Sequence, residues 1–231
     1  MTEVSHMFIN YLLIAAGCIT QAFFIKTEHE ENYKTAVFQK GLASLMFVLI
    51  GVLAWVQNGE QPIIRTIVVG LIFGMAGDIL LNLRFVYPEN GKKIFLTGIL
   101  AFLIGHILYL KAIIPLSDGL MVPTVIGALI AAALLAYIFK TMEVNIAYKV
   151  FGVFYLGAVI IMTCIAFSNA LAVPDAFRVT YAIGAVFFTL SDIVLIFNTF
   201  GKTTKFSLRI TNLSLYYIGQ VMIALSLHFL L

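Results

Sequence analysis

Long apolar runs alternate with short polar breaks along the whole chain. Eight runs are long enough to cross a bilayer as helices, which takes about 17–25 mostly apolar residues. They are 7–25, 37–56, 64–83, 94–113, 121–139, 147–168, 177–198 and 208–231. The runs are continuous and do not alternate polar with apolar positions, which favours helices over strands. The pattern predicts an all-α integral membrane protein with eight transmembrane helices.

Composition supports the same class. Hydrophobic residues make up 62% of the 231 residues and charged residues 11%, with a mean hydropathy of +1.05. Soluble domains are about 45–50% apolar and about 25% charged. We therefore expect a single transmembrane domain over residues 1–231, multi-pass in the cell membrane. The net charge of +3 is small and its cations lie in loops, so we expect no nucleic-acid partner.

The distribution of Lys and Arg predicts the orientation. Eleven of the 14 lie in or beside the loops that follow odd-numbered runs, and only Arg65, Lys111 and Arg178 lie toward the other face. The positive-inside rule places the Lys/Arg-rich loops in the cytoplasm. The odd-numbered loops are therefore predicted to be cytoplasmic, with both termini on the outer face.

An internal repeat appears when the sequence is offset by 114 residues. Gly70, Phe73 and Asp78 then fall on Gly184, Phe187 and Asp192, and the segments 22–26 and 105–106 fall on 136–140 and 219–220. Four runs per half is an even number, so the halves, about 1–115 and 116–231, share one orientation. We expect two tandem four-helix repeats related by a pseudo-twofold axis along the membrane normal, with the third helices facing each other across it.

Two acidic residues, Asp78 and Asp192, lie deep within apolar runs, at repeat-equivalent positions. An ionised Asp at a helix centre costs about 2.5–3.5 kcal/mol on insertion scales, so such residues are usually functional. Burial disfavours the charged form, and two nearby carboxyls resist double ionisation. A pair with one protonated and one ionised carboxyl can supply an acid and a base. The structural alternative is that each Asp only holds helices together by hydrogen bonds.

Other polar side chains lie on the same helical runs. His106 lies near the middle of the fourth run, with Tyr109 three residues on and so on the same face. The repeat places Gln220 opposite His106, Tyr216 precedes Gln220 by four residues, and Asn82 follows Asp78 by four. Each of these could instead be a hydrogen-bonded residue of the protein interior. The polar groups thus cluster on the third, fourth, seventh and eighth runs, and we expect a catalytic role for His106 and substrate binding by Tyr216, Gln220, Tyr109 and Asn82.

Lys40 begins the second run, at the predicted cytoplasmic edge. It could extend to the interface, or it could pair with a lipid phosphate. Asp78, Asp192 and His106 together could also form a metal site. Because no histidine or cysteine spacing typical of zinc accompanies them, we expect neither a metal nor a cofactor.

The motifs at residues 70–81, 102–109, 187–192 and 216–220 resemble the YhhN family of eight-span membrane proteins, which includes lysoplasmalogenases. The resemblance implies hydrolysis of the vinyl ether bond of a lysoplasmalogen, a lysophospholipid taken from the bilayer. It assigns acid–base roles to Asp78 and Asp192, an orienting or relay role to His106, and water or substrate positioning to Tyr216 and Gln220. One departure is that Lys40 precedes glycine, where the family often has proline.

Two other functions fit the same pattern. Parallel repeats with carboxyls near the membrane midplane also occur in transporters, where an Asp pair can serve proton coupling. A non-catalytic membrane assembly factor would need the buried Asp residues only for packing. The sequence leaves open the headgroup preference, the identity of the acid and the oligomeric state.

Overall fold

The computed structural model describes residues 3–143 and 145–230, and this part of the chain contains helices and no strands. Eight helices are long and apolar enough to cross a membrane, which confirms the predicted fold class. They are α1 (Glu3–His29), α2 (Tyr33–Asn58), α3 (Pro62–Val86), α4 (Gly91–Ile113), α5 (Met121–Thr141), α6 (Ile146–Ala172), α7 (Ala176–Phe200) and α8 (Phe206–Ser226). Three short 3₁₀ helices are η1 (Pro88–Asn90), η2 (Ile114–Leu116) and η3 (Leu227–Phe229).

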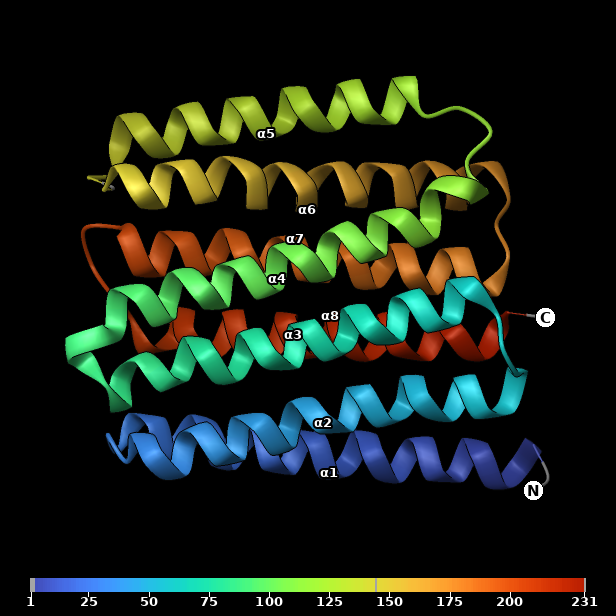
Figure 1. Cartoon of the computed structure of the whole chain (residues 1–231), viewed down its shortest axis with the longest axis horizontal. Coiled ribbons are helices and arrows are strands. Elements are labelled where there is room, and N and C mark those ends of the chain that lie inside the picture. The colour runs from blue at the N-terminus through green and yellow to red at the C-terminus, as the bar shows by residue number, and fades with distance from the viewer. Residues whose placement is uncertain (1–2, 144, 231) are drawn as a thin grey trace.

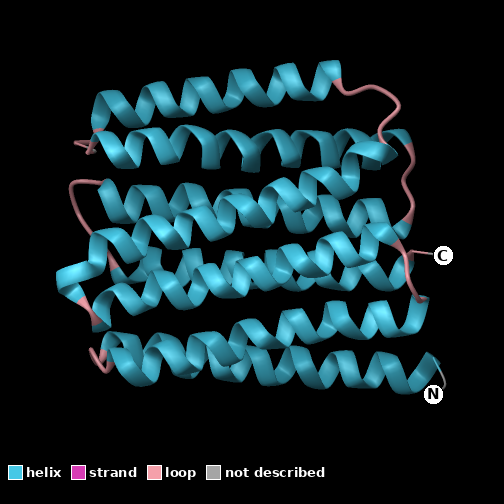
Figure 2. Ribbon diagram, in the orientation of Figure 1, coloured by secondary structure: helices cyan, strands magenta, loops and turns pink. Residues whose placement is uncertain are grey.

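The helices run up and down in a flat bundle (Figure 1), with short connections at its two ends (Figure 2). The pair α1 and α2 forms one flank and the pair α5 and α6 the other, with α3, α4, α7 and α8 between them. The loops that follow α1, α3, α5 and α7 lie at one end, which we call the odd-loop end. Both labelled termini lie at the opposite end. The odd-loop end is the one predicted to be cytoplasmic, and that sidedness stays a prediction.

Local sequence explains where several helices begin and end. Pro62 opens α3, where its missing N–H loses no helical bond. Asn145 and Asp175 cap α6 and α7 by accepting hydrogen bonds from backbone N–H groups of the first turn, at 3.1 and 2.8 Å. Gly59 ends α2 at φ +75°, a left-handed conformation that favours glycine. The polar breaks of the sequence therefore become tight connections between adjacent helices.

The two halves show matching features at the 114-residue offset. Both bounds of α7 lie 114 residues after those of α3. A Cβ on Gly105 would lie 3.1 Å from the carbonyl oxygen of Gly70, and one on Gly219 would lie 2.9 Å from that of Gly184. The backbones of α3 and α4, and of α7 and α8, therefore nearly touch, as small residues allow in membranes. The tandem repeat and its pseudo-twofold axis both stay predictions.

The 114-residue offset pairs α4 with α8 and α2 with α6. The contact between α4 and α6 therefore has a counterpart in the contact between α8 and α2. The helices α3 and α7, expected to face each other, are not among the extensively packed pairs. They instead contribute to the walls of a common cavity. Aromatic and aliphatic side chains fill the remaining centre of the bundle, whereas apolar residues such as Met121 and Ile146 are exposed on its outside, where lipid is expected.

Candidate functional site

A cavity inside the bundle is lined by both Asp78 on α3 and Asp192 on α7. Its volume is about 120 Å³, which is room for several water molecules. It extends from the two carboxyls to the odd-loop end, where Arg84, Tyr148 and Phe200 lie among its lining. Most of the wall is apolar, with a few polar groups, as in sites for small ligands. The chain thus brings its two predicted acidic residues to one cavity.

Asp78 is surrounded by donors from two other helices. Its Oδ2 accepts hydrogen bonds from the Ser44 hydroxyl on α2 at 2.5 Å and from the Tyr216 hydroxyl on α8 at 2.7 Å. The Lys40 Nζ on α2 lies 3.4 Å from its Oδ1 and 4.5 Å from the centre of the Tyr216 ring. A buried carboxylate is tolerated only with such partners. This environment therefore favours the ionised form of Asp78.

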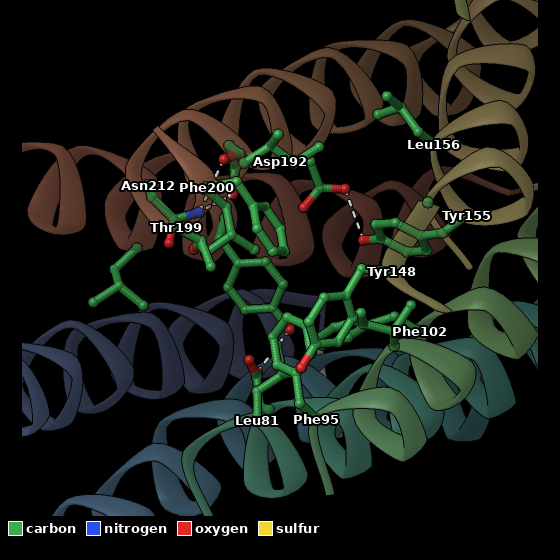
Figure 3. A pocket seen from close by; sticks show the side chains of 18 of the residues that line it. Leu81, Phe95, Phe102, Tyr148, Tyr155, Leu156, Asp192, Thr199, Phe200 and Asn212 are labelled. Atoms are coloured by element: carbon green, nitrogen blue, oxygen red, sulfur yellow. Dashed lines mark hydrogen bonds between the residues drawn. The ribbon is translucent and has the colours of Figure 1, made fainter. Parts of the chain in front are cut away.

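Asp192 has fewer polar partners than Asp78. Its Oδ2 accepts one hydrogen bond, at 2.7 Å, from the Tyr155 hydroxyl on α6, and Figure 3 shows the two side chains meeting at the cavity. Asp192 forms no ion pair with any described residue. It is as buried as Asp78, each being 4% exposed. Without a compensating cation, the neutral form of Asp192 is favoured.

A line of hydrogen bonds continues from Asp78 away from the cavity. The Gln220 amide donates to the Tyr216 hydroxyl at 3.4 Å, and the Tyr109 hydroxyl donates to the Gln220 carbonyl at 2.9 Å. Tyr216 lines the cavity, whereas Gln220 and Tyr109 do not. The latter two therefore hold the Tyr216 hydroxyl in place beside Asp78, and their contact with substrate stays a prediction.

Comparison with known proteins identifies the family of this chain. The YhhN family model matches residues 8–227, which include every residue that lines the cavity. The chain belongs to the YhhN family. No curated protein and no solved structure matches it.

The YhhN protein places Lys40 differently from what the sequence suggested. Lys40 was expected at the membrane edge, but α2 begins at Tyr33, so Lys40 lies two turns inside the helix and is 1% exposed. Of the two alternatives for Lys40, the one in which its ammonium extends to the interface is wrong. The ammonium pairs with Asp78 at 3.4 Å and lies 3.5 Å from the Gln21 side-chain oxygen, and these partners offset the loss of water. Lys40 also lines the cavity, so contact with substrate stays a prediction.

His106 lies behind the cavity wall. Its Nδ1 is 2.8 Å from the Phe102 carbonyl oxygen, and its ring packs edge-on against Phe188 and Tyr155, with centroids 4.5 and 5.5 Å away. Its buried Nε2 has no hydrogen-bond partner in the described part of the protein. Since no hydrogen bond joins it to either carboxyl there, His106 supports the ring of Tyr155, and a direct relay role stays a prediction.

Asn82 lines the cavity beside Asp78, and its contact with substrate stays a prediction. Its amide donates to the Asp78 carbonyl oxygen at 2.8 Å, and its oxygen lies 3.5 Å from the Arg209 guanidinium on α8. Arg209 in turn forms a bidentate ion pair with Glu28 on α1, with N–O distances of 2.6 and 2.9 Å. The wall near the odd-loop end is therefore fixed by a network that joins three helices.

Several polar residues of the site were not predicted. Ser44 and Tyr155 donate to the two carboxyls, and Asn212 donates to the backbone and hydroxyl oxygens of Ser191 at 2.9 Å. A single hydroxyl changes the hydropathy of an apolar run very little, so it gives almost no signal. Tyr155 has no polar equivalent in the other half, because the offset pairs it with Gly41.

The described residues contain no group of three or more His, Cys, Asp or Glu side chains able to hold a metal ion. The polar groups of the cavity lining are carboxyls, hydroxyls, amides and cations. This set can transfer protons and stabilise a transient positive charge.

Proposed function

We propose that this YhhN protein hydrolyses the vinyl ether bond of lysoplasmalogen, releasing a fatty aldehyde and a glycerophospho-ethanolamine or -choline. The observation that carries the proposal is the pair of buried carboxyls that line one cavity with unequal partners. Vinyl ether hydrolysis needs a proton donor for carbon and a negative charge that stabilises the resulting cation. Family membership supports this choice of reaction.

The inequality of the carboxyls follows from differences between the two halves. Asp78 and Asp192 are repeat equivalents, but their surroundings have diverged. Around Asp78 the polar partners are Lys40, Ser44 and Tyr216; the positions equivalent to these three hold Phe154, Ala158 and Phe102. The two equivalent positions thus hold the same carboxyl group, but their neighbours differ. These neighbours favour the ionised form of Asp78 and the neutral form of Asp192. We assign Asp192 as the acid and Asp78 as the base.

The reaction then proceeds in two proton-balanced stages. Asp192 protonates the alkenyl carbon distal to the oxygen, which leaves an oxocarbenium ion stabilised by the Asp78 carboxylate. Water adds to this cation while Asp78 takes its proton, giving a hemiacetal. In the second stage the hemiacetal hydroxyl returns a proton to Asp192, and Asp78 protonates the departing glycerol oxygen. Both carboxyls regain their starting states, much as the carboxyl pair of a glycosidase does.

The cavity suits this substrate in shape and polarity. Its apolar wall includes Leu135 and Ile138 on α5, Leu156 on α6 and Ile196 on α7, which can hold the alkenyl tail. Its volume also accommodates the attacking water. We place the polar headgroup at the odd-loop end, where the helices reach the membrane interface.

Aldehyde release by the purified protein in detergent tests the proposal. Asp192→Asn and Asp78→Asn should each lower turnover of lysoplasmalogen at least about a hundredfold, the usual range for loss of an acid or base. Asp118→Asn is the matched control, because Asp118 is exposed and does not line the cavity. Wild-type turnover in either cavity variant, with the variant folded, would contradict the mechanism.

Transport of an amphiphile is the second candidate, because a cavity that reaches one end of the bundle is also expected for one state of a carrier. The same preparation separates the two functions. A hydrolase releases aldehyde in detergent, whereas a carrier shows activity only across a sealed vesicle. Absence of aldehyde together with uptake of lysophospholipid into vesicles would replace the hydrolase by the carrier.

A further inference from the structure

Arg84, near the end of α3, is a cation of the cavity lining that no ion pair with a described residue engages. Its guanidinium stacks against Phe85 and Phe95, with centroids 4.6 and 4.4 Å away. It has no hydrogen bond or ion pair with a described residue. The other cations of the lining are engaged, Lys40 by Asp78 and Arg209 by Glu28. Arg84 is therefore held in place by aromatic rings while its hydrogen-bond donors stay available.

The surroundings of Arg84 favour an anion from outside the protein. The acidic residues of the lining, Asp78 and Asp192, both lie at the deep end of the cavity. Near Arg84 the wall is aromatic: the Tyr148 ring lies 5.3 Å from that of Phe95 and 5.7 Å from that of Phe200. Aromatic walls keep water away and strengthen a charge-assisted hydrogen bond. The planar guanidinium suits a phosphate, whose oxygens it can bind in pairs.

The spacing between Asp78 and Arg84 along α3 also fits the distance from the ether bond to the phosphate of the substrate. Arg84 follows Asp78 by six residues, which is about 9 Å of helix. A three-carbon glycerol unit, with the two side chains reaching toward it, covers this length. A substrate whose ether bond lies at Asp78 and Asp192 would thus carry its phosphate to Arg84.

We propose that Arg84 binds the phosphodiester of the substrate. This inference rests on the proposed function for the position of the ether bond. It adds that the phosphate is required, because the guanidinium donors of Arg84 have no partner among the described residues.

The first experiment compares three substrates with the same alkenyl tail: the phosphoethanolamine, the phosphocholine and the phosphate-free alkenylglycerol. Arg84→Gln should lower kcat/KM for both phospholipids by about ten- to a hundredfold, the range for a lost hydrogen bond to a charged group. It should leave kcat/KM for alkenylglycerol unchanged. Lys93→Gln is the control, since it removes a charge from the same end of the protein at an exposed position outside the cavity. An equal loss on all three substrates would overturn the inference.

A binding measurement separates this inference from the hydrolase proposal. Wild-type protein should bind acyl lysophosphatidylcholine, which has no vinyl ether, more tightly than a monoacylglycerol of the same tail, and Arg84→Gln should abolish that difference. Glycerophosphate alone shows whether a free phosphate suffices without a tail. If aldehyde is never released but the Arg84-dependent preference is found, the hydrolase fails and the phosphate site stands. If the preference is unaffected by Arg84→Gln, the phosphate site fails whatever the activity.

Discussion

Replacing Lys40 by methionine removes the ammonium that lies 3.4 Å from Asp78 and keeps most of the side-chain volume. Both residues are buried, so the substitution leaves Asp78 as a charge with fewer partners. Breaking a buried ion pair in this way destabilises a protein by about 3–5 kcal/mol. We expect the lower part of this range, about 3 kcal/mol, because the hydroxyls of Ser44 and Tyr216 still donate to Asp78.

A double-mutant cycle measures the coupling directly. In the Lys40→Met background, Asp78→Asn removes the stranded charge and should restore most of the lost stability, giving a coupling free energy of at least about 2 kcal/mol. The assay is equilibrium or thermal unfolding in one detergent, with retention of helix content as a check on folding. Lys26→Met is the control, because Lys26 and Glu30 are 3.9 Å apart but 73% and 58% exposed. That variant should change stability by less than about 1 kcal/mol. Equal effects of Lys40→Met and Lys26→Met would refute the description of Lys40 as a buried partner of Asp78.

Three further predictions concern the cavity and the helix crossings. Tyr155→Phe removes the hydroxyl that donates to the α7 carboxyl; we expect kcat to fall up to about tenfold with little change in KM, in steady-state kinetics. Gly152→Leu extends a side chain into open space beside the cavity and should lower kcat/KM by about tenfold or more. Gly157 also faces open space but lies outside the lining, so Gly157→Leu should leave kcat/KM unchanged. An equal loss of kcat/KM in the two leucine variants would disprove the cavity as the binding site. Gly184→Ala places a Cβ 2.9 Å from the Gly219 carbonyl oxygen and should reduce stability by about 1–3 kcal/mol. Gly157→Ala should leave stability near wild type in the same unfolding assay.

The fold could be predicted because its main determinant is the length of apolar runs, which a sequence records directly. Helix ends were predicted less well. The second run was placed at 37–56, whereas α2 spans Tyr33–Asn58. The first turn, with the polar residues Tyr33, Lys34 and Thr35, looks like a loop in a hydropathy window. In the structure this turn is helical, and Lys40 finds its partner on α3. That partnership between distant positions cannot be read from either segment alone.

The site was predictable where a residue is costly in an apolar helix. Asp78 and Asp192 stand out for that reason, and both line the cavity. Hydroxyls such as those of Ser44 and Tyr155 carry no such penalty, so their roles as donors emerge only from packing. His106 was conspicuous in the sequence, yet side-chain direction places it behind the wall. Sequence position fixes depth in the membrane, whereas the direction of a side chain depends on how neighbouring helices cross.

The unlike surroundings of Asp78 and Asp192 bear on how the predicted repeat could become asymmetric. Two identical four-helix units, assembled as a symmetric dimer, would give both carboxyls the same neighbours, because symmetry imposes identical interfaces. In one polypeptide the two equivalent positions can hold different residues, as Lys40 and Phe154 do at the 114-residue offset. Under the proposed mechanism, joining the halves in one chain thus allows the two aspartates to take different roles.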